Sequence, residues 1–134
     1  MQVQALRYFE ALIPLIPNAS SLALLGGSDA TMSLARFPAL PDEYLRFLTE
    51  IGHGDLGPLV LYSSPIAPAV VYSEARATSL EGIVLFGDDM QGYCYGFDLS
   101  DDGRVVEIDP RGVVDRTIEP SFGRFLRALL VANT

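Results

Sequence analysis

The strongest constraint on the fold is a series of three short apolar segments separated by turns rich in aspartate and glycine. The segments are Ile83 to Phe86, Tyr93 to Phe97 and Arg104 to Ile108. Each has the length and the β-branched or aromatic content typical of a strand. The segments Gly87 to Gly92 and Ser100 to Gly103 read as turns, and short turns make consecutive strands reverse direction. The sequence therefore predicts an antiparallel β-meander in the middle of the chain.

Two segments with helical periodicity flank this meander. Pro41 suits the first position of the earlier helix, and Gly52 can adopt the left-handed conformation that closes its last turn. The later helix is expected to begin near Ser121 and to end near Val131. Each helix carries one apolar stripe that faces the core. The stripes consist of Tyr44, Phe47, Leu48 and Ile51 in the first helix and of Phe122, Phe125, Leu126, Leu129 and Leu130 in the second.

The remaining elements have weaker signals. They are a helix over 3–13 that Pro14 ends, a helix capped by Ser28 or Asp29 that ends near Arg36, a strand over 59–62 that the prolines of 63–68 break, a segment over 70–76 compatible with helix or loop, and a strand over 113–118. With helices toward both ends and strands in the middle, the pattern is that of an α+β fold. A chain of 134 residues fits a single domain, 1–134, with one core.

The charge balance excludes some classes of function. The chain has 17 acidic and nine basic residues, a net charge of −8, whereas nucleic-acid binding requires a basic surface. Cys94 is the single cysteine, so no intramolecular disulfide can form, and a reducing, cytoplasmic location is expected. The start of the chain lacks the layout of a signal peptide, and no apolar run is long enough for a membrane helix.

One part of the charge pattern favours a protein partner. Between Asp88 and Asp109 there are seven acids and a single base, Arg104. This run is either a solvated rim of turns or a negative patch that meets a basic protein. On the second interpretation, the candidate partner-binding residues are Asp55, Asp88, Asp89, Asp101 and Asp102.

A calcium loop is one chemical alternative. Asp98, Ser100, Asp102, Gly103 and Asp109 occupy positions 1, 3, 5, 6 and 12 of an EF-hand pattern. However, the last position is an aspartate where a bidentate glutamate is expected, and both flanks read as strands instead of helices. A hairpin turn explains the same residues. The sequence therefore predicts no metal and no cofactor.

A second alternative is a small hydrolase with a thiolate nucleophile. Cys94 and His53 would form the dyad, with Asp55 or Asp88 orienting the imidazole. A cysteine inside a strand more often acts as a small apolar side chain, and a histidine in a glycine-rich loop suits a turn. We therefore expect no catalytic residues and no enzymatic activity.

Three segments, in order, resemble the SUKH superfamily, which includes fungal regulators of cell-wall synthesis and many bacterial toxin-immunity proteins. They are a Leu-Pro helix that ends near a glycine, a strand with a Gly-Asp turn that leads into a second strand, and a closing Ser-Phe helix. The matching positions are Pro41, Gly52, Gly87, Asp88, Gly92, Asp98 and Phe122. The resemblance covers residues 28–131, while 1–27 hold the N-terminal helix and a segment without clear periodicity.

The resemblance implies antiparallel strands packed by helices, and a protein-binding role without catalysis. Bacterial members often neutralise toxins by stoichiometric binding, so a basic toxin domain is the expected partner; a regulatory or scaffold module is the alternative. The matched residues have architectural roles in this reading. Pro41 and Gly52 bound a helix, Gly87 and Gly92 shape a turn, and Phe122 fills the core.

Overall fold

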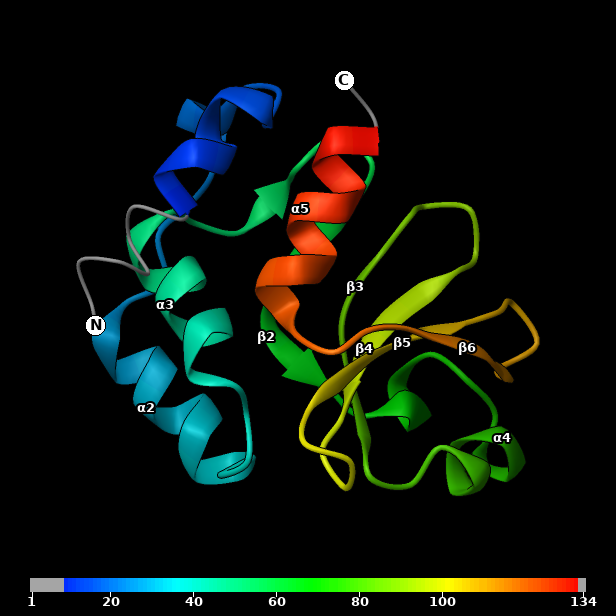
Figure 1. The fold of residues 1–134 in the computed structure, drawn as a ribbon. Helices are drawn as coiled ribbons and strands as arrows, with labels where there is room; N and C mark the ends of the chain where they lie inside the picture. Colours follow the sequence, from blue (N-terminus) through cyan, green and yellow to red (C-terminus); the bar gives the residue numbers. More distant parts are fainter. Residues whose placement is uncertain (1–8, 133–134) are drawn as a thin grey trace.

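The computed structural model describes residues 9–132, which form one antiparallel sheet with helices on both sides (Figure 1). The six strands lie in the order β1-β2-β3-β4-β5-β6, so every strand pairs with its neighbours in the sequence. The predicted meander and the α+β class are thereby confirmed. The strands are β1 Gly54–Asp55, β2 Val60–Ile66, β3 Ile83–Asp88, β4 Cys94–Asp98, β5 Arg104–Ile108 and β6 Val114–Glu119.

The helices lie before, within and after the sheet. The α-helices are α2 Gly27–Arg36, α3 Asp42–Glu50, α4 Glu74–Ser79 and α5 Phe122–Ala132, and the short 3-10 turns are η1 Ile13–Leu15, η2 Ala19–Ser21 and η3 Pro68–Val70. Of the helix expected over 3–13, residues 3–8 lie outside the described residues. Residues 9–12 are helical and continue into η1.

The main core forms where α3 and α5 pack on one face of the sheet. Four rings meet there, and each comes from one of the predicted elements. Tyr44 of α3 lies 5.0 Å from Phe97 of β4 and 5.3 Å from Phe122 of α5, measured between ring centroids. Phe86 of β3 lies 4.5 Å from Phe97 and 5.5 Å from Phe122. Such pairs contribute about 0.5–1.5 kcal/mol each beyond their burial.

The start of α5 is tied directly to α3. The Glu43 carboxylate accepts a hydrogen bond of 2.8 Å from the backbone N–H of Gly123, in the first turn of α5. The first N–H groups of a helix lack partners within it, and a carboxylate also interacts favourably with the positive end of the helix dipole. This bond therefore fixes the register between two helices that are 80 residues apart.

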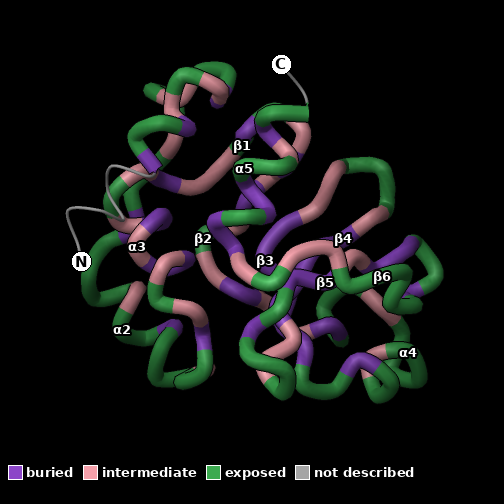
Figure 2. Tube along the Cα trace, viewed as in Figure 1, coloured by how far each residue is buried: buried purple, intermediate pink, exposed green. Residues whose placement is uncertain are grey.

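A second, smaller apolar cluster lies on the other face of the sheet. It consists of Leu80, Ile83, Leu85, Cys94, Val106 and Ile108, with Tyr62, Ile66 and Tyr72 packed against it. The segment that contains η3 and α4 lies on this side. Because of this cover, β3 and β4 are buried on both faces, and buried positions run through the centre of the sheet (Figure 2). This two-sided burial explains why both strands read as continuous apolar runs.

Two helix starts differ from the predictions. The cap of α2 is not Ser28 or Asp29: the helix begins at Gly27, and the extended residue Gly26 is its N-cap, with no side-chain cap bond. The carbonyl of Gly26 instead accepts the first helical bond, from Ala30, and glycine is tolerated at this position. Pro41 likewise is the N-cap of α3 and not its first helical residue.

The prediction that prolines break the second strand is wrong. β2 continues from Val60 through Pro65 to Ile66. Its register against β3 shifts between Leu61 and Ile66, and β1 covers only Val60 and Leu61 on the other side. Pro65 therefore occupies an irregular segment where no ladder bond requires its missing N–H, which is where strands accept proline.

Gly87 has a role other than the predicted one. It lies within β3 instead of the turn, and an added Cβ would be 2.6 Å from the Val60 carbonyl oxygen and 2.9 Å from a Leu59 methyl group. Close approach of the β2 backbone thus requires glycine there. Gly92, with φ +101°, does shape the turn as predicted, and Gly52, with φ +130°, follows the end of α3.

We predict that Phe125→Ala lowers the free energy of unfolding by about 3–5 kcal/mol, because it removes a buried ring that contacts Phe86 and Tyr95. Urea denaturation measures the change. Arg124→Ala, at an exposed position of the same helix, is the control and should change stability by less than about 0.5 kcal/mol. A loss below about 1 kcal/mol for Phe125→Ala would show that α5 is peripheral.

We predict that Gly87→Ala destabilises the protein by about 1–3 kcal/mol, because β2 must move away from the new methyl group. Gly27→Ala is the matched control, since no atom lies within 4 Å of a Cβ built at that helical position. The control should be neutral or stabilising by up to about 1 kcal/mol. Equal stability of the two variants in thermal denaturation would contradict the packing argument.

Candidate functional site

One end of the sheet gathers three of the predicted binding residues. The strand register aligns Asp55 of β1 with Val60 of β2, and Val60 with Asp88 of β3. Asp55 and Asp88 are therefore two strand spacings, or about 10 Å, apart. Asp89 follows directly in the turn between β3 and β4. We call Asp55, Asp88 and Asp89 the acidic end.

The first role of these aspartates is to hold turns. In each of them Oδ1 accepts a hydrogen bond from the backbone N–H two residues later, an arrangement that aspartate adopts readily. The bonds run from Gly57 to Asp55, from Met90 to Asp88 and from Gln91 to Asp89, each at 2.8 Å. The carboxylates are consequently fixed in orientation by the backbone.

The second oxygens of the acidic end differ in availability. Asp88 Oδ2 accepts a hydrogen bond of 2.5 Å from the Tyr62 hydroxyl. Burial, and next this bond, raise the pKa of Tyr62, so the phenol stays protonated and keeps donating. Asp55 and Asp89 have no partner for Oδ2 within residues 9–132. Asp55 is exposed and Asp89 is half-buried, so these two carboxylates can accept bonds from another molecule.

A neighbouring carboxylate at the same end is already neutralised. Asp109, in the turn after β5, binds the Arg111 guanidinium at 2.6 Å. It also accepts the backbone N–H of Val113 at 3.1 Å. These bonds, that to Arg111 foremost, lower the pKa of Asp109. This aspartate therefore stabilises its own turn and adds little net charge to the acidic end.

Asp101 and Asp102 lie at the opposite end of the sheet. They belong to the turn between β4 and β5, and the length of β4 separates this turn from Asp88 by about 15 Å. Asp102 has φ +56°, and Asp101 pairs with Arg104 at 3.3 Å. The acidic run of the sequence is thus divided between two ends of the sheet and does not form one patch.

The proposed thiol dyad does not come together. Cys94 is buried in β4, whereas His53 precedes β1 and bridges to Ala23, so three strand spacings of about 14 Å separate them. Burial, the largest cause, raises the pKa of the Cys94 thiol, which is the opposite of what a nucleophile needs.

The residues of the proposed calcium loop form a hairpin. Strands β4 and β5 flank the loop, and Asp98 Oδ1 accepts bonds from the backbone N–H and the hydroxyl of Ser100, at 3.1 and 2.5 Å. In the part of the chain described, no three His, Cys, Asp or Glu side chains are grouped in a way that could hold a metal ion. Local hydrogen bonds account for Asp98 and Ser100.

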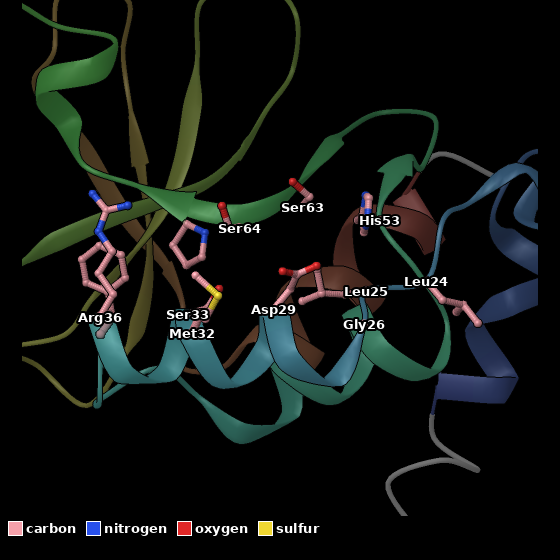
Figure 3. Close-up of a pocket in the computed structure, with 12 residues that line it drawn as sticks. Leu24, Leu25, Gly26, Asp29, Met32, Ser33, Arg36, His53, Ser63 and Ser64 are labelled. Carbon is pink, nitrogen blue, oxygen red and sulfur yellow. The ribbon is translucent and has the colours of Figure 1, made fainter.

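A groove that the sequence interpretation missed lies between α2 and β2 (Figure 3). Its volume is about 460 Å³. The wall from α2 consists of Asp29, Met32, Ser33 and Arg36, and the wall from β2 consists of Ser63, Ser64 and Pro65. The i, i+3, i+4, i+7 spacing of the α2 residues places them on one face of the helix. The sequence interpretation did not identify this face because it mixes apolar, polar and charged side chains.

Comparison with models of known families and with curated proteins found no match for this chain. Within residues 9–132, no helix combines the length and the apolar character required to cross a bilayer.

We predict that Cys94 in the folded protein reacts with iodoacetamide at pH 8 at least about tenfold more slowly than in urea. Each unit of pKa increase removes about nine-tenths of the reactive thiolate, and burial adds a steric barrier. Mass spectrometry of the alkylated chain over time measures both rates. A folded-state rate equal to or above that of the unfolded chain would restore Cys94 as a candidate nucleophile.

Proposed function

We propose that this protein is a non-catalytic protein-binding module of the SUKH type, and that it neutralises a basic toxin domain by stoichiometric binding. The three segments that resemble the superfamily are far apart in the sequence. They supply Tyr44, Phe86, Phe97 and Phe122, whose rings pack together in one core. This convergence is what a shared fold would require, and it supports the proposal.

The observation that carries the proposal is the pair of open carboxylates at the acidic end. Asp55 and Asp89 are each held by one oxygen and leave the other without a partner in the described chain. A carboxylate already fixed by the backbone loses little freedom when it binds an arginine or lysine. Bonds between such ionised groups are also stronger than neutral ones.

The net charge of −8 adds a long-range contribution. It would attract a basic partner before contact and raise the rate of association, and salt would weaken this effect. Once bound, the module acts by covering the active site or substrate surface of the toxin. No group of this chain needs to take part in chemistry.

The direct test starts from the genes adjacent to the one for this protein: any that encodes a basic secreted domain is co-expressed with it. We expect the cells to survive the toxin, and we expect native mass spectrometry to detect a complex of fixed stoichiometry. Survival without a complex would mean that the protein acts by another route. A stable complex with a cellular protein and no protection would favour the regulatory module instead.

We predict that Asp55→Asn with Asp89→Asn slows association with the basic partner about tenfold at low salt and leaves stability nearly unchanged. The Asn oxygens can still accept the turn bonds. Asp101→Asn with Asp102→Asn, which removes the same charge at the far end, is the matched control. Stopped-flow kinetics across a salt series measures how steeply the association rate constant falls with salt. This dependence should be shallower than wild type for the Asp55 and Asp89 variant and unchanged for the control. Equal slopes for both pairs would mean that the acidic end is a solvated rim.

A further inference from the structure

Within residues 9–132, the middle of β2 has no paired neighbour on either side. Leu61 pairs with β1 and β3, and Ile66 pairs with Leu85, but the register assigns no opposite residue to 62–65. Four residues of β2 thus span one position of β3. On the outer side β1 is too short to reach them, because the chain at His53 turns away to bridge with Ala23. The outer edge of this segment is therefore accessible to a further strand.

Helix α2 runs alongside this unpaired segment and forms the other wall of the groove (Figure 3). Ten residues of α2 extend about 15 Å, and residues 62–66 of β2 extend about 17 Å. The groove is therefore as long as an extended peptide of about five residues. A helix beside an open strand edge is the geometry in which proteins add a peptide as an extra strand.

The groove also carries hydroxyl groups on both walls. Ser33 of α2 lines it and is only 8% exposed as a residue, but its hydroxyl is not among the fully buried atoms that lack a partner. On the opposite wall Ser63 is exposed and Ser64 is half-buried, so both hydroxyls are accessible to a ligand. A hydroxyl can both donate and accept hydrogen bonds, so these serines can bind the alternating N–H and C=O groups of a peptide backbone.

The two ends of the groove differ in charge. Asp29 lies toward the end near His53, and Arg36 lies at the opposite end, beyond Ser64, with its guanidinium 4.9 Å from the centre of the Phe37 ring. Both charged residues are exposed. Phe37 also borders a second hollow of about 300 Å³, which Leu80, Val84 and other apolar residues line. This hollow can receive an apolar side chain that continues past Arg36.

We infer that this groove binds an extended segment of a partner protein as an additional strand beside residues 62–65. The segment carries a basic side chain opposite Asp29 and an acidic one opposite Arg36, with an apolar side chain in the hollow beyond Phe37. The inference rests on the proposed role in protein binding. It concerns a different surface from the acidic end, which lies beside the paired part of β2.

The probes are two blocked heptapeptides of alternating valine and threonine. One has arginine near its first and glutamate near its last position, and the other has the reverse order. Chemical shifts of the backbone amides of the ¹⁵N-labelled protein follow the titration. We expect shifts concentrated in residues 28–37 and 62–66, and we expect one peptide to bind about fivefold more tightly than the other. N-methylation at alternate residues of the better peptide should abolish binding, since it removes main-chain donors.

A charge exchange tests the orientation. Asp29→Arg with Arg36→Glu should reverse the preference between the two peptides. Both positions are exposed, so the fold should survive. Glu50→Arg with Arg127→Glu, which exchanges the same charges at exposed positions outside the groove, is the control and should keep the wild-type preference.

Several results would overturn the inference. They are an absence of shifts at millimolar peptide, binding that survives N-methylation, equal affinity for both peptides, and shifts that appear without peptide as the protein self-associates. These experiments need no toxin, and the groove variants retain Asp55 and Asp89. Failure of the groove therefore leaves the neutralisation test unaffected, and failure of neutralisation leaves the groove result unaffected.

Discussion

Four aromatic rings at the junction of α3, β3, β4 and α5 hold the remainder of this fold in place. Tyr44 and Phe122 come from helices on the same face, and Phe86 and Phe97 come from adjacent central strands. Every ring contacts at least two of the others at distances typical of edge-on or tilted packing. Because these contacts fix the helices on the central strands, the loops at the sheet ends are free to vary in charge and shape.

The aspartates of those loops serve two purposes that are hard to separate. One oxygen of each builds a turn, and only the remaining oxygen is open to a partner. Both oxygens of Asp88 accept hydrogen bonds, one from the backbone and one from Tyr62. Within residues 9–132, Asp55 and Asp89 each accept hydrogen bonds through one oxygen alone. The number of acidic residues in the sequence therefore overstates how many carboxylates can bind a basic protein. The sheet also places those carboxylates at two separate ends.

Apolar periodicity was enough to predict α3 and α5, and the three central strands could be predicted from short runs of β-branched or aromatic residues bounded by turns. The extent of β2 could not be predicted, since Pro65 is acceptable only where the register slips and no neighbour needs its N–H. The role of Gly87 was also hidden: a glycine that admits a neighbouring backbone looks the same in sequence as one that turns the chain. The groove beside α2 depends on how short β1 is, which composition does not reveal.

The uninterrupted strand order has a consequence for how the chain reaches this structure. Every strand pairs with its neighbours in the sequence, and only the connection between β2 and β3, which holds η3 and α4, is longer than a turn or short loop, so the loss of loop entropy on pairing is small. The bond between Glu43 and Gly123, in contrast, joins positions 80 residues apart. Docking of α5 beside α3 therefore costs more loop entropy than the pairing of neighbouring strands. A chain that lacks α5 would leave Tyr44, Phe86 and Phe97 without the ring of Phe122 that covers them.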